Sequence, residues 1–209
     1  MSAARLDVDG LACERGGRPL FGPVSFSLRA GEWMHLQGDN GAGKTSLLRM
    51  VGGLSPAAAG EVRWSGVPIR QCAEGYRADM LYLGHTLSLK DDLSALENLQ
   101  FEAAVRDEPL DEVRARQGLS ALGLRGREHL PLRVLSQGQK RRAALARLLT
   151  TRARLWLLDE PFVALDPGAV THLVDLLGQH VAQGGLVLYT SHQTVPMGGS
   201  GHHLRLSSP

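Results

Sequence analysis

Residues 38–45 read Gly-Asp-Asn-Gly-Ala-Gly-Lys-Thr, and residues 135–139 read Leu-Ser-Gln-Gly-Gln. The first stretch fits the pattern G-x-x-x-x-G-K-[ST], in which glycines let the backbone curl so that its N–H groups point at phosphate oxygens. Alone, it indicates only that the chain binds a nucleoside triphosphate. The second stretch narrows the class. The residues predicted to hold the nucleotide are Gly38, Asp39, Asn40, Gly41, Ala42, Gly43, Lys44, Thr45 and Ser46.

The phosphate loop is flanked by the elements that such a loop needs. Residues 32–37 predict the strand that leads into it, and 45–51 predict the helix that follows. Short apolar runs that alternate with helical patterns are typical of α/β architecture. The run 155–159 is nearly all apolar, as expected of a central parallel strand that is buried on both faces. Further strands are predicted at 6–12, 24–28, 61–64, 80–84 and 186–190.

The middle of the chain, from about residue 85 to 133, has a different character. It carries no long apolar strand and predicts helices that are broken at Pro109, Gly118, Gly123 and Pro131. Residues 94–97, Ser-Ala-Leu-Glu, form a capping box, which predicts a helix from there to about residue 105. We therefore expect a helical insertion within an α/β core.

Two carboxylates and two loop residues are predicted to carry the chemistry. Lys44 is placed to reach the terminal phosphates, and the Thr45 hydroxyl to ligate Mg²⁺. Residues 155–160 form an apolar strand that ends in Asp159 and Glu160. In P-loop proteins an Asp at such a strand end helps to hold Mg²⁺, and a carboxylate beyond it can activate the attacking water. Asp159 is the predicted metal-side carboxylate and Glu160 the predicted catalytic base. A plain acidic turn is the simpler alternative.

Residues 135–139 precede a predicted helix over 139–149, with Ser136 as its N-cap. A helix N-terminus after Ser and Gly is an anion site, although five residues alone are equally compatible with a plain cap. Seven basic residues lie between Arg133 and Arg154, and no aromatic residues are interleaved as single-strand nucleic-acid binding would favour. Four of them, Lys140, Arg141, Arg142 and Arg147, are interpreted as the solvated side of this helix, whose other face is rich in Ala and Leu. With a formal net charge of only +2, the chain is not expected to bind nucleic acid.

Leu-Ser-Gln-Gly-Gln at 135–139 resembles the signature motif of ABC ATPases, which usually reads LSGGQ. The order phosphate loop, signature, acidic strand, Ala164-Leu-Asp166 and His192 resembles that family over almost the whole chain. The resemblance implies a head-to-tail dimer in which Ser136, Gln137, Gly138 and Gln139 of one copy complete the ATP site of the other. It also implies that Asp166 lies in the loop at the dimer seam and that His192 contacts the γ-phosphate.

The same resemblance implies the domain organisation. We expect a RecA-like P-loop core with an N-terminal antiparallel β subdomain and an inserted α-helical subdomain, in a single ABC ATPase domain over 1–209. The core would comprise 1–84 and 142–209, and the helical subdomain with the signature 85–141. A chain of 209 residues is long enough for one sizeable core.

Two positions depart from the general ABC pattern. His85 lies where the family usually has a glutamine, and its imidazole is shorter than a glutamine side chain. Residues 13–15, Cys-Glu-Arg, occupy the loop where a base-stacking aromatic is usual, and an Arg plane there could stack on adenine. Together with Gly31-Glu-Trp33, residues 93–99 and Asp159-Glu-Pro-Phe162, these positions resemble ATP-binding subunits of cytochrome c maturation transporters, the haem-exporter type.

That resemblance implies ATP and Mg²⁺ as cofactors and a homodimer that drives an integral membrane permease subunit, alongside other cytochrome c maturation proteins. The work would concern haem handling or release of a haem chaperone. The resemblance also implies peripheral association with the cytoplasmic face of a bacterial inner membrane. No apolar run approaches the roughly 18 residues that span a bilayer, so the chain is not expected to be a membrane span itself. Residues 85–94 are the expected membrane-subunit contact. Cys13 and Cys72, which lack metal-ligand spacing, are expected to be reduced.

Four alternatives stay open from the sequence. The chain could serve another ABC transporter, or be a soluble ABC ATPase of translation or DNA repair, although those usually carry two cassettes or a coiled-coil insertion. It could be a nucleotide-binding regulatory module without turnover, against which Glu160 and His192 argue. A P-loop kinase would lack the helix that follows residues 135–139.

Overall fold

The computed structural model describes residues 4–207, which form two compact units. The first unit contains the chain up to Tyr82, Ala153–Glu160 and the residues from Leu176 onward. The second contains Leu83–Arg152 and Pro161–Asp175. The second compact unit thus also includes residues 142–152 and 161–175. The predicted bounds of the helical subdomain, 85–141, stay a prediction. No helix in the described part of the chain is long and apolar enough to cross a membrane.

An antiparallel sheet of the first unit has the order β2-β1-β4-β5. Its strands are β1 (Arg5–Arg15), β2 (Arg18–Arg29), β4 (Ala59–Trp64) and β5 (Val67–Pro68). Gly16 and Gly17 both have positive φ and turn β1 into β2, a conformation that two-residue hairpins favour. Leu6 lies opposite Leu28 on one side and Trp64 on the other, so one face of the sheet is apolar and buried.

The second sheet has the order β6-β7-β8-β3-β9. It consists of β3 (Glu32–Gln37), β6 (Met80–Leu83), β7 (Leu155–Leu158), β8 (Leu186–Thr190) and β9 (Ser200–Arg205). The pairs β7/β8, β8/β3 and β3/β9 are parallel, which brings the carboxyl ends of β3, β7 and β8 to one edge. Ligands of open α/β sheets bind at that edge. As predicted, β7 is buried along its whole length.

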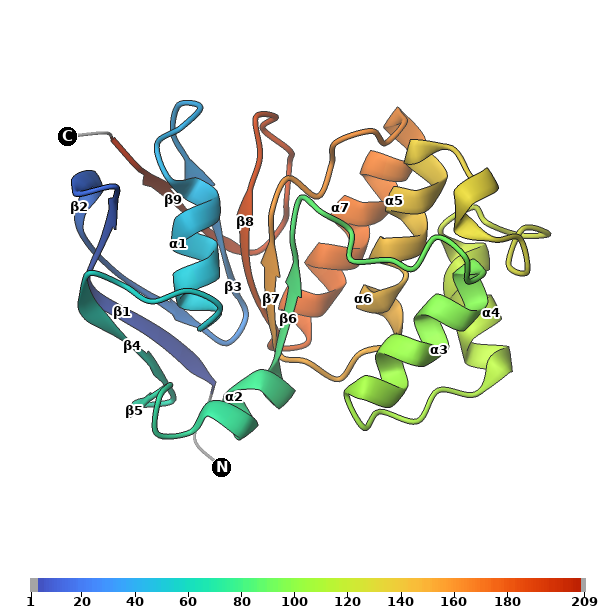
Figure 1. The fold of residues 1–209 in the computed structure, drawn as a ribbon, viewed down its shortest axis with the longest axis horizontal. Coiled ribbons are helices and arrows are strands. Elements are labelled where there is room, and N and C mark those ends of the chain that lie inside the picture. The colour runs from blue at the N-terminus through green and yellow to red at the C-terminus, as the bar shows by residue number, and fades with distance from the viewer. Residues whose placement is uncertain (1–3, 208–209) are drawn as a thin grey trace. The chain divides into compact units, whose positions relative to one another are not determined.

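Helix α1 (Lys44–Val51) packs between the two sheets of the first unit (Figure 1). Its apolar residues Leu47, Leu48 and Val51 join one core with Leu6 and Leu28 of the antiparallel sheet and with residues of β3, β7 and β8. Helix α2 (Ala73–Asp79) buries Tyr76, whose hydroxyl donates to the carbonyl of Val51 at 2.8 Å. Helix α7 (Pro167–Ala182) runs from the second unit into the first.

The second unit is built from helices. They are α3 (Ala95–Val105), α4 (Glu112–Ala121), a 3₁₀ turn (Leu132–Val134), α5 (Gln137–Leu145), α6 (Arg147–Thr150) and the first part of α7. The capping box predicted for α3 is confirmed. The Ser94 hydroxyl accepts from the Glu97 amide at 3.2 Å, and the Glu97 carboxylate accepts from the Ser94 amide at 2.8 Å.

Two local predictions were wrong, and one strand was not predicted. Gly118 lies inside α4 and does not break a helix; a Cβ there would stand 3.6–3.9 Å from Thr150, Leu149 and Ala146, which is an ordinary contact distance. The helix predicted over 139–149 begins at Gln137 and is divided into α5 and α6. Strand β9 carries no apolar alternation and was not predicted, since only pairing with β3 makes it a strand.

The basic residues of α5 and α6 are not a solvated face, contrary to the sequence-based interpretation. Arg141 is buried and donates to the carbonyls of Pro161 and Gly84. Arg147, with a side chain only 13% exposed, pairs with Glu102 at 2.8 Å. Burial lowers the pKa of the Arg147 guanidinium, while the Glu102 charge raises it. Partners outside the helix therefore satisfy these two arginines: Glu102 of α3 pairs with Arg147, and carbonyl oxygens accept hydrogen bonds from Arg141.

Candidate nucleotide site

The phosphate loop adopts a conformation that requires its glycines. It leaves the carboxyl end of β3, and Gly38, Gly41 and Gly43 all have positive φ. At Gly38 a Cβ would stand 2.7 Å from the carbonyl oxygen of Leu206, and at Gly43 it would stand 2.6 Å from the ring of Phe21. The loop is thus held by backbone conformation and by close neighbours. The positive φ values and the close neighbours both exclude side chains at Gly38 and Gly43, so the loop there presents only backbone atoms.

Lys44 begins α1 and is buried. Its ammonium donates to the carbonyl oxygens of Gly38 at 2.7 Å and Asp39 at 3.2 Å, so the charge lies over the mouth of the loop. Carbonyl oxygens are weaker partners for an ammonium than charged phosphate oxygens are. The side chain is therefore placed to exchange these bonds for phosphate contacts.

Asp159 follows β7 and is 2% exposed. Its Oδ2 accepts a hydrogen bond from the Thr45 hydroxyl at 2.8 Å, and its Oδ1 accepts one from the Thr190 hydroxyl at 2.8 Å. The predicted metal pair, Thr45 and Asp159, is thus brought into contact across 114 residues of sequence. Hydroxyl and carboxylate oxygens are ligands that suit Mg²⁺ when substrate phosphates supply others.

Glu160 and His192, the predicted catalytic residues, lie side by side. Oε1 of Glu160 is 3.5 Å from Nε2 of His192, and Oε2 accepts from the His192 backbone amide at 3.3 Å. The carboxylate is 14% exposed, whereas the imidazole, just beyond β8, is 56% exposed. Glu160 has φ +51°, and its amide donates to the Thr190 hydroxyl at 2.9 Å. A shielded carboxylate beside an accessible imidazole can share a proton or a water between them.

Thr190 and His35 were missed by reasoning from the sequence. Thr190 is fully buried and contacts both carboxylate residues, Asp159 and Glu160. His35 in β3 stacks on Tyr189 at 4.7 Å, and its Nε2 lies 3.0 Å from the carbonyl oxygen of Ser191, next to His192. Burial lowers the pKa of His35. The only available signal was the closeness of Thr190 to His192 in sequence.

The signature residues lie in the second unit, at the start of α5. Ser136 caps the helix by accepting from the Gln139 amide at 3.3 Å, and the Gln139 side chain accepts from the Ser136 amide at 2.9 Å. Ser136 and Gln137 are exposed. A Cβ on Gly138 would stand 2.9 Å from the carbonyl oxygen of Ala164, so the backbone passes too close for a side chain. The capped helix end therefore presents its first amides on the surface.

Asp166 and His85 also belong to the second unit. Asp166 accepts from the Ala169 amide at 2.9 Å and pairs with Arg142 at 3.0 Å. These partners, the amide first, lower the pKa of its carboxyl group. His85 is exposed in the loop after β6. Its role at a metal ion stays a prediction, as does adenine stacking by Arg15, which is exposed at the end of β1. Cys13 and Cys72 are free thiols.

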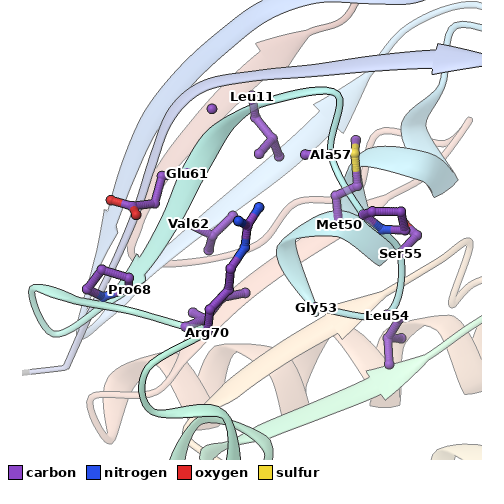
Figure 2. Close-up of a pocket in the computed structure, with 13 residues that line it drawn as sticks. Leu11, Met50, Gly53, Leu54, Ser55, Ala57, Glu61, Val62, Pro68 and Arg70 are labelled. Carbon is purple, nitrogen blue, oxygen red and sulfur yellow. The ribbon is translucent and has the colours of Figure 1, made fainter.

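A separate cavity of about 500 Å³ lies in the first unit (Figure 2). Its apolar lining includes Leu11, Met50 and Val62, and the Arg70 side chain extends beside Val62. None of its lining residues is among those predicted to hold the nucleotide. The cavity and the phosphate loop are therefore distinct features of this unit.

Known proteins resemble this chain over most of its length. The family model described as ABC transporter matches residues 21–163. Two relatives named cytochrome c biogenesis ATP-binding export protein CcmA are 50% identical to the chain. The one from Dechloromonas aromatica (strain RCB) aligns over 202 residues, 96% of this chain and 99% of its own. The one from Nitrosomonas europaea aligns over 203 residues, 97% of this chain and 95% of its own. A CcmA of Escherichia coli (strain K12) is 48% identical over 188 residues, 90% of this chain and 89% of its own.

Solved structures agree on the fold. A putative ABC transporter ATP-binding protein from Pyrococcus furiosus superposes with a TM-score of 0.84 at 22% identity, over 97% of each chain. A dimeric ATP-binding cassette in a post-hydrolysis state, bound to ADP and Pi, superposes with a TM-score of 0.79 at 22% identity, covering 90% of this chain and 88% of its own. The predicted fold class is thereby confirmed.

Proposed function

Because the chain belongs to the ABC transporter family, and within it to the cytochrome c biogenesis ATP-binding export proteins, we propose that two copies of it bind two MgATP between them and drive a membrane subunit by hydrolysis. The observation that carries the catalytic part is one connected group of side chains. Thr45, Asp159, Thr190, Glu160 and His192 are joined by contacts of 2.8–3.5 Å at one edge of the parallel sheet.

Residues 38–46 bind the phosphates in this proposal. The loop amides surround the phosphate oxygens, and the Lys44 ammonium moves from the carbonyls of Gly38 and Asp39 to the terminal phosphates. Thr45 and Asp159 are the residues that would hold Mg²⁺, which would supply positive charge against the phosphates. The buried position of Asp159 keeps its carboxylate in one orientation for this purpose.

Glu160 acts as the general base. Its carboxylate accepts a proton from the water that attacks the terminal phosphorus, and His192 contacts the γ-phosphate oxygens. The 3.5 Å approach of the two side chains supports this division of roles, because one water or one phosphate oxygen can contact both. The greater exposure of His192 leaves its ring available to the nucleotide.

The site is completed by the second copy of the chain. Ser136, Gln137, Gly138, Gln139 and Asp166 of that copy contribute the signature helix end and the loop at the seam. The exposure of Ser136 and Gln137 supports this, because a capped helix N-terminus is an anion site that needs an approaching ligand. His85 contributes from the loop after β6 in place of the usual glutamine.

The partner is an integral membrane permease subunit, joined by other cytochrome c maturation proteins. We place the chain as a peripheral subunit at the cytoplasmic face of a bacterial inner membrane, with residues 85–94 as its contact. The task is haem handling or release of a haem chaperone. The names of the relatives, which are 48–50% identical to this chain, support this assignment.

The test is to co-purify the full chain with its membrane partner and measure phosphate release from ATP. Lys44→Ala is expected to abolish turnover, because the loop loses the only side-chain ammonium that the motif directs at the phosphates. Arg49→Ala, which alters an exposed residue of the same helix, is the matched control and should retain activity. Undiminished hydrolysis by Lys44→Ala would contradict the site. Nucleotide binding without hydrolysis by the wild type would favour a regulatory module.

A further inference from the structure

We propose that Thr190 is a positioning residue for hydrolysis, which fixes both Asp159 and Glu160 through its one hydroxyl group. The inference rests on the proposed function of this site. Thr190 is the last residue of β8, and the two carboxylates follow β7, the neighbouring parallel strand. The two strand ends thus deliver three functional groups to one place.

The hydroxyl makes two different hydrogen bonds. It donates its proton to Oδ1 of Asp159 at 2.8 Å and accepts from the backbone amide of Glu160 at 2.9 Å. A hydroxyl has one donor and two lone pairs, so it can make both bonds at once. Because the directions are complementary, one side chain connects the metal-side carboxylate to the backbone of the catalytic base.

The bond to Asp159 fixes the plane of its carboxylate. Oδ2 is held by the Thr45 hydroxyl and Oδ1 by the Thr190 hydroxyl, so the two oxygens are bound by groups from α1 and β8. A carboxylate held at both oxygens cannot rotate about its terminal torsion without breaking a bond. Thr190 thereby sets the direction in which Asp159 presents its remaining lone pairs to a cation.

The bond to Glu160 fixes its backbone. Glu160 has φ +51°, the left-handed region that side chains other than glycine adopt only when neighbours impose it. The Thr190 hydroxyl holds the amide of this residue, and Oε2 of the same residue accepts from the His192 amide at 3.3 Å. Thr190 and His192 are two residues apart in one segment. The segment 190–192 therefore makes hydrogen bonds to both the backbone amide and the carboxylate of Glu160.

Burial makes this hydroxyl hard to replace. Thr190 is completely inaccessible, and Asp159 is 2% exposed. Solvent therefore has little access to supply the two hydrogen bonds if the hydroxyl is removed. Its β-branched shape suits a strand, and valine has the same shape without the hydroxyl, so a substitution can separate packing from hydrogen bonding.

The experiment compares Thr190→Val with Thr190→Ser in the full chain co-purified with its membrane partner. Thr190→Val is expected to lower kcat for ATP about 30-fold, because small misplacements of catalytic groups cost up to about 100-fold. KM for ATP should stay within about twofold, because the phosphate loop is untouched, and half-maximal activity should need more Mg²⁺. Thr190→Ser keeps the hydroxyl and should retain kcat within about threefold.

Three results would overturn the inference. They are a wild-type kcat in Thr190→Val, a loss in Thr190→Ser as large as in the valine variant, or a loss confined to KM. Thermal melts report folding, and Thr190→Ala is assessed by the same criteria if the valine variant does not fold. A wild-type rate in Thr190→Val alongside an inactive Lys44→Ala overturns this inference alone. A wild-type complex that releases no phosphate overturns both this inference and the proposed function.

Discussion

The two parts of the site differ in how their polar groups are satisfied. In the first unit Asp159 is buried, and both its oxygens accept hydrogen bonds from hydroxyls of the same unit. In the second unit Ser136 and Gln137 are exposed at the start of α5, and the cap satisfies only some of the amides there. The first arrangement is assembled within one chain, whereas in the proposed dimer the second presents its donors to another copy.

The difference is consistent with the proposal that a second copy of the chain completes the site. Buried carboxylates must be fixed by neighbours, because an unsatisfied charge in a protein interior is costly. The amides of an exposed helix N-terminus need no protein partner, because they can bind water or an anion. Substitutions in the first unit should therefore alter chemistry, and substitutions in the signature should alter assembly.

Among substitutions that leave ATP binding intact, the largest effect is expected for Glu160→Gln, which removes the general base and keeps the shape of the side chain. Turnover should fall about 1,000-fold, since general bases contribute roughly 10²–10⁴. ATP binding should remain, and gel filtration with MgATP should show a trapped dimer. Lys44→Ala, which should bind ATP poorly, serves as the control without a dimer. Only monomers of the glutamine variant would contradict the division between chemistry and assembly.

The second prediction concerns whether a partly buried ion pair stabilises the second unit more than an exposed ion pair does. Glu102 pairs with Arg147, and the two side chains are 22% and 13% exposed. Glu102→Gln should lower the free energy of unfolding by about 2 kcal/mol, less than the loss of a fully buried pair. Urea denaturation measures it. The matched control is Glu112→Gln, from an exposed pair with Arg116, which should cost under about 0.5 kcal/mol. Equal losses would mean that burial is not the cause.

The third prediction concerns the cap of α5. Ser136→Ala removes the hydroxyl that accepts from the Gln139 amide, at a cost of about 1 kcal/mol to the helix. Formation of the dimer with MgATP should weaken roughly fivefold, the change in an equilibrium constant that corresponds to this free energy. ATP binding by the separate chains should not change, because the phosphate loop lies in the other unit. Ser120→Ala, in α4, is the control. Weaker ATP binding by the monomeric chain would contradict the assignment of Ser136 to the partner's site.

The smallest effect is a pH dependence within the first unit. His180 stacks on Trp156 at 3.6 Å, and burial lowers its pKa to about 4. In the unfolded chain the imidazole gains a proton near pH 6.5, whereas in the folded chain it does so only near pH 4. Its contribution is therefore complete above about pH 7 and is lost as the pH falls from 6.5 toward 4.

Between pH 7.5 and 6 this group should lower the free energy of unfolding by about 0.8 kcal/mol. Denaturation at both pH values measures it. His180→Phe keeps an aromatic ring on Trp156 and should flatten the dependence by that amount. Turnover at temperatures where the chain stays folded should not follow this titration, since His180 is not among the site residues. An unchanged slope in His180→Phe would assign the dependence to other groups.

Much of the site was predictable because its signals are local. Gly38, Gly41 and Gly43 have positive φ, and with Lys44 and Thr45 they form a pattern within eight residues. The capping boxes at Ser94 and Ser136 each act over four residues. Asp159 and Glu160 were identifiable because an apolar strand precedes them. Each of these features leaves a pattern within a few consecutive residues, so it can be recognised in the sequence.

The sequence by itself therefore determined the phosphate loop, the Ser136 cap of the signature helix, and the strands that precede the loop and the two carboxylates. Tertiary structure alone decided which distant groups meet. Pairing with β3 makes a strand of Ser200–Arg205, Glu102 draws Arg147 inward, and β8 brings the Thr190 hydroxyl to Asp159. The physical reason is that a buried polar group is specified by its partner in space, and those partners lie 31 to 168 residues away or on another helix.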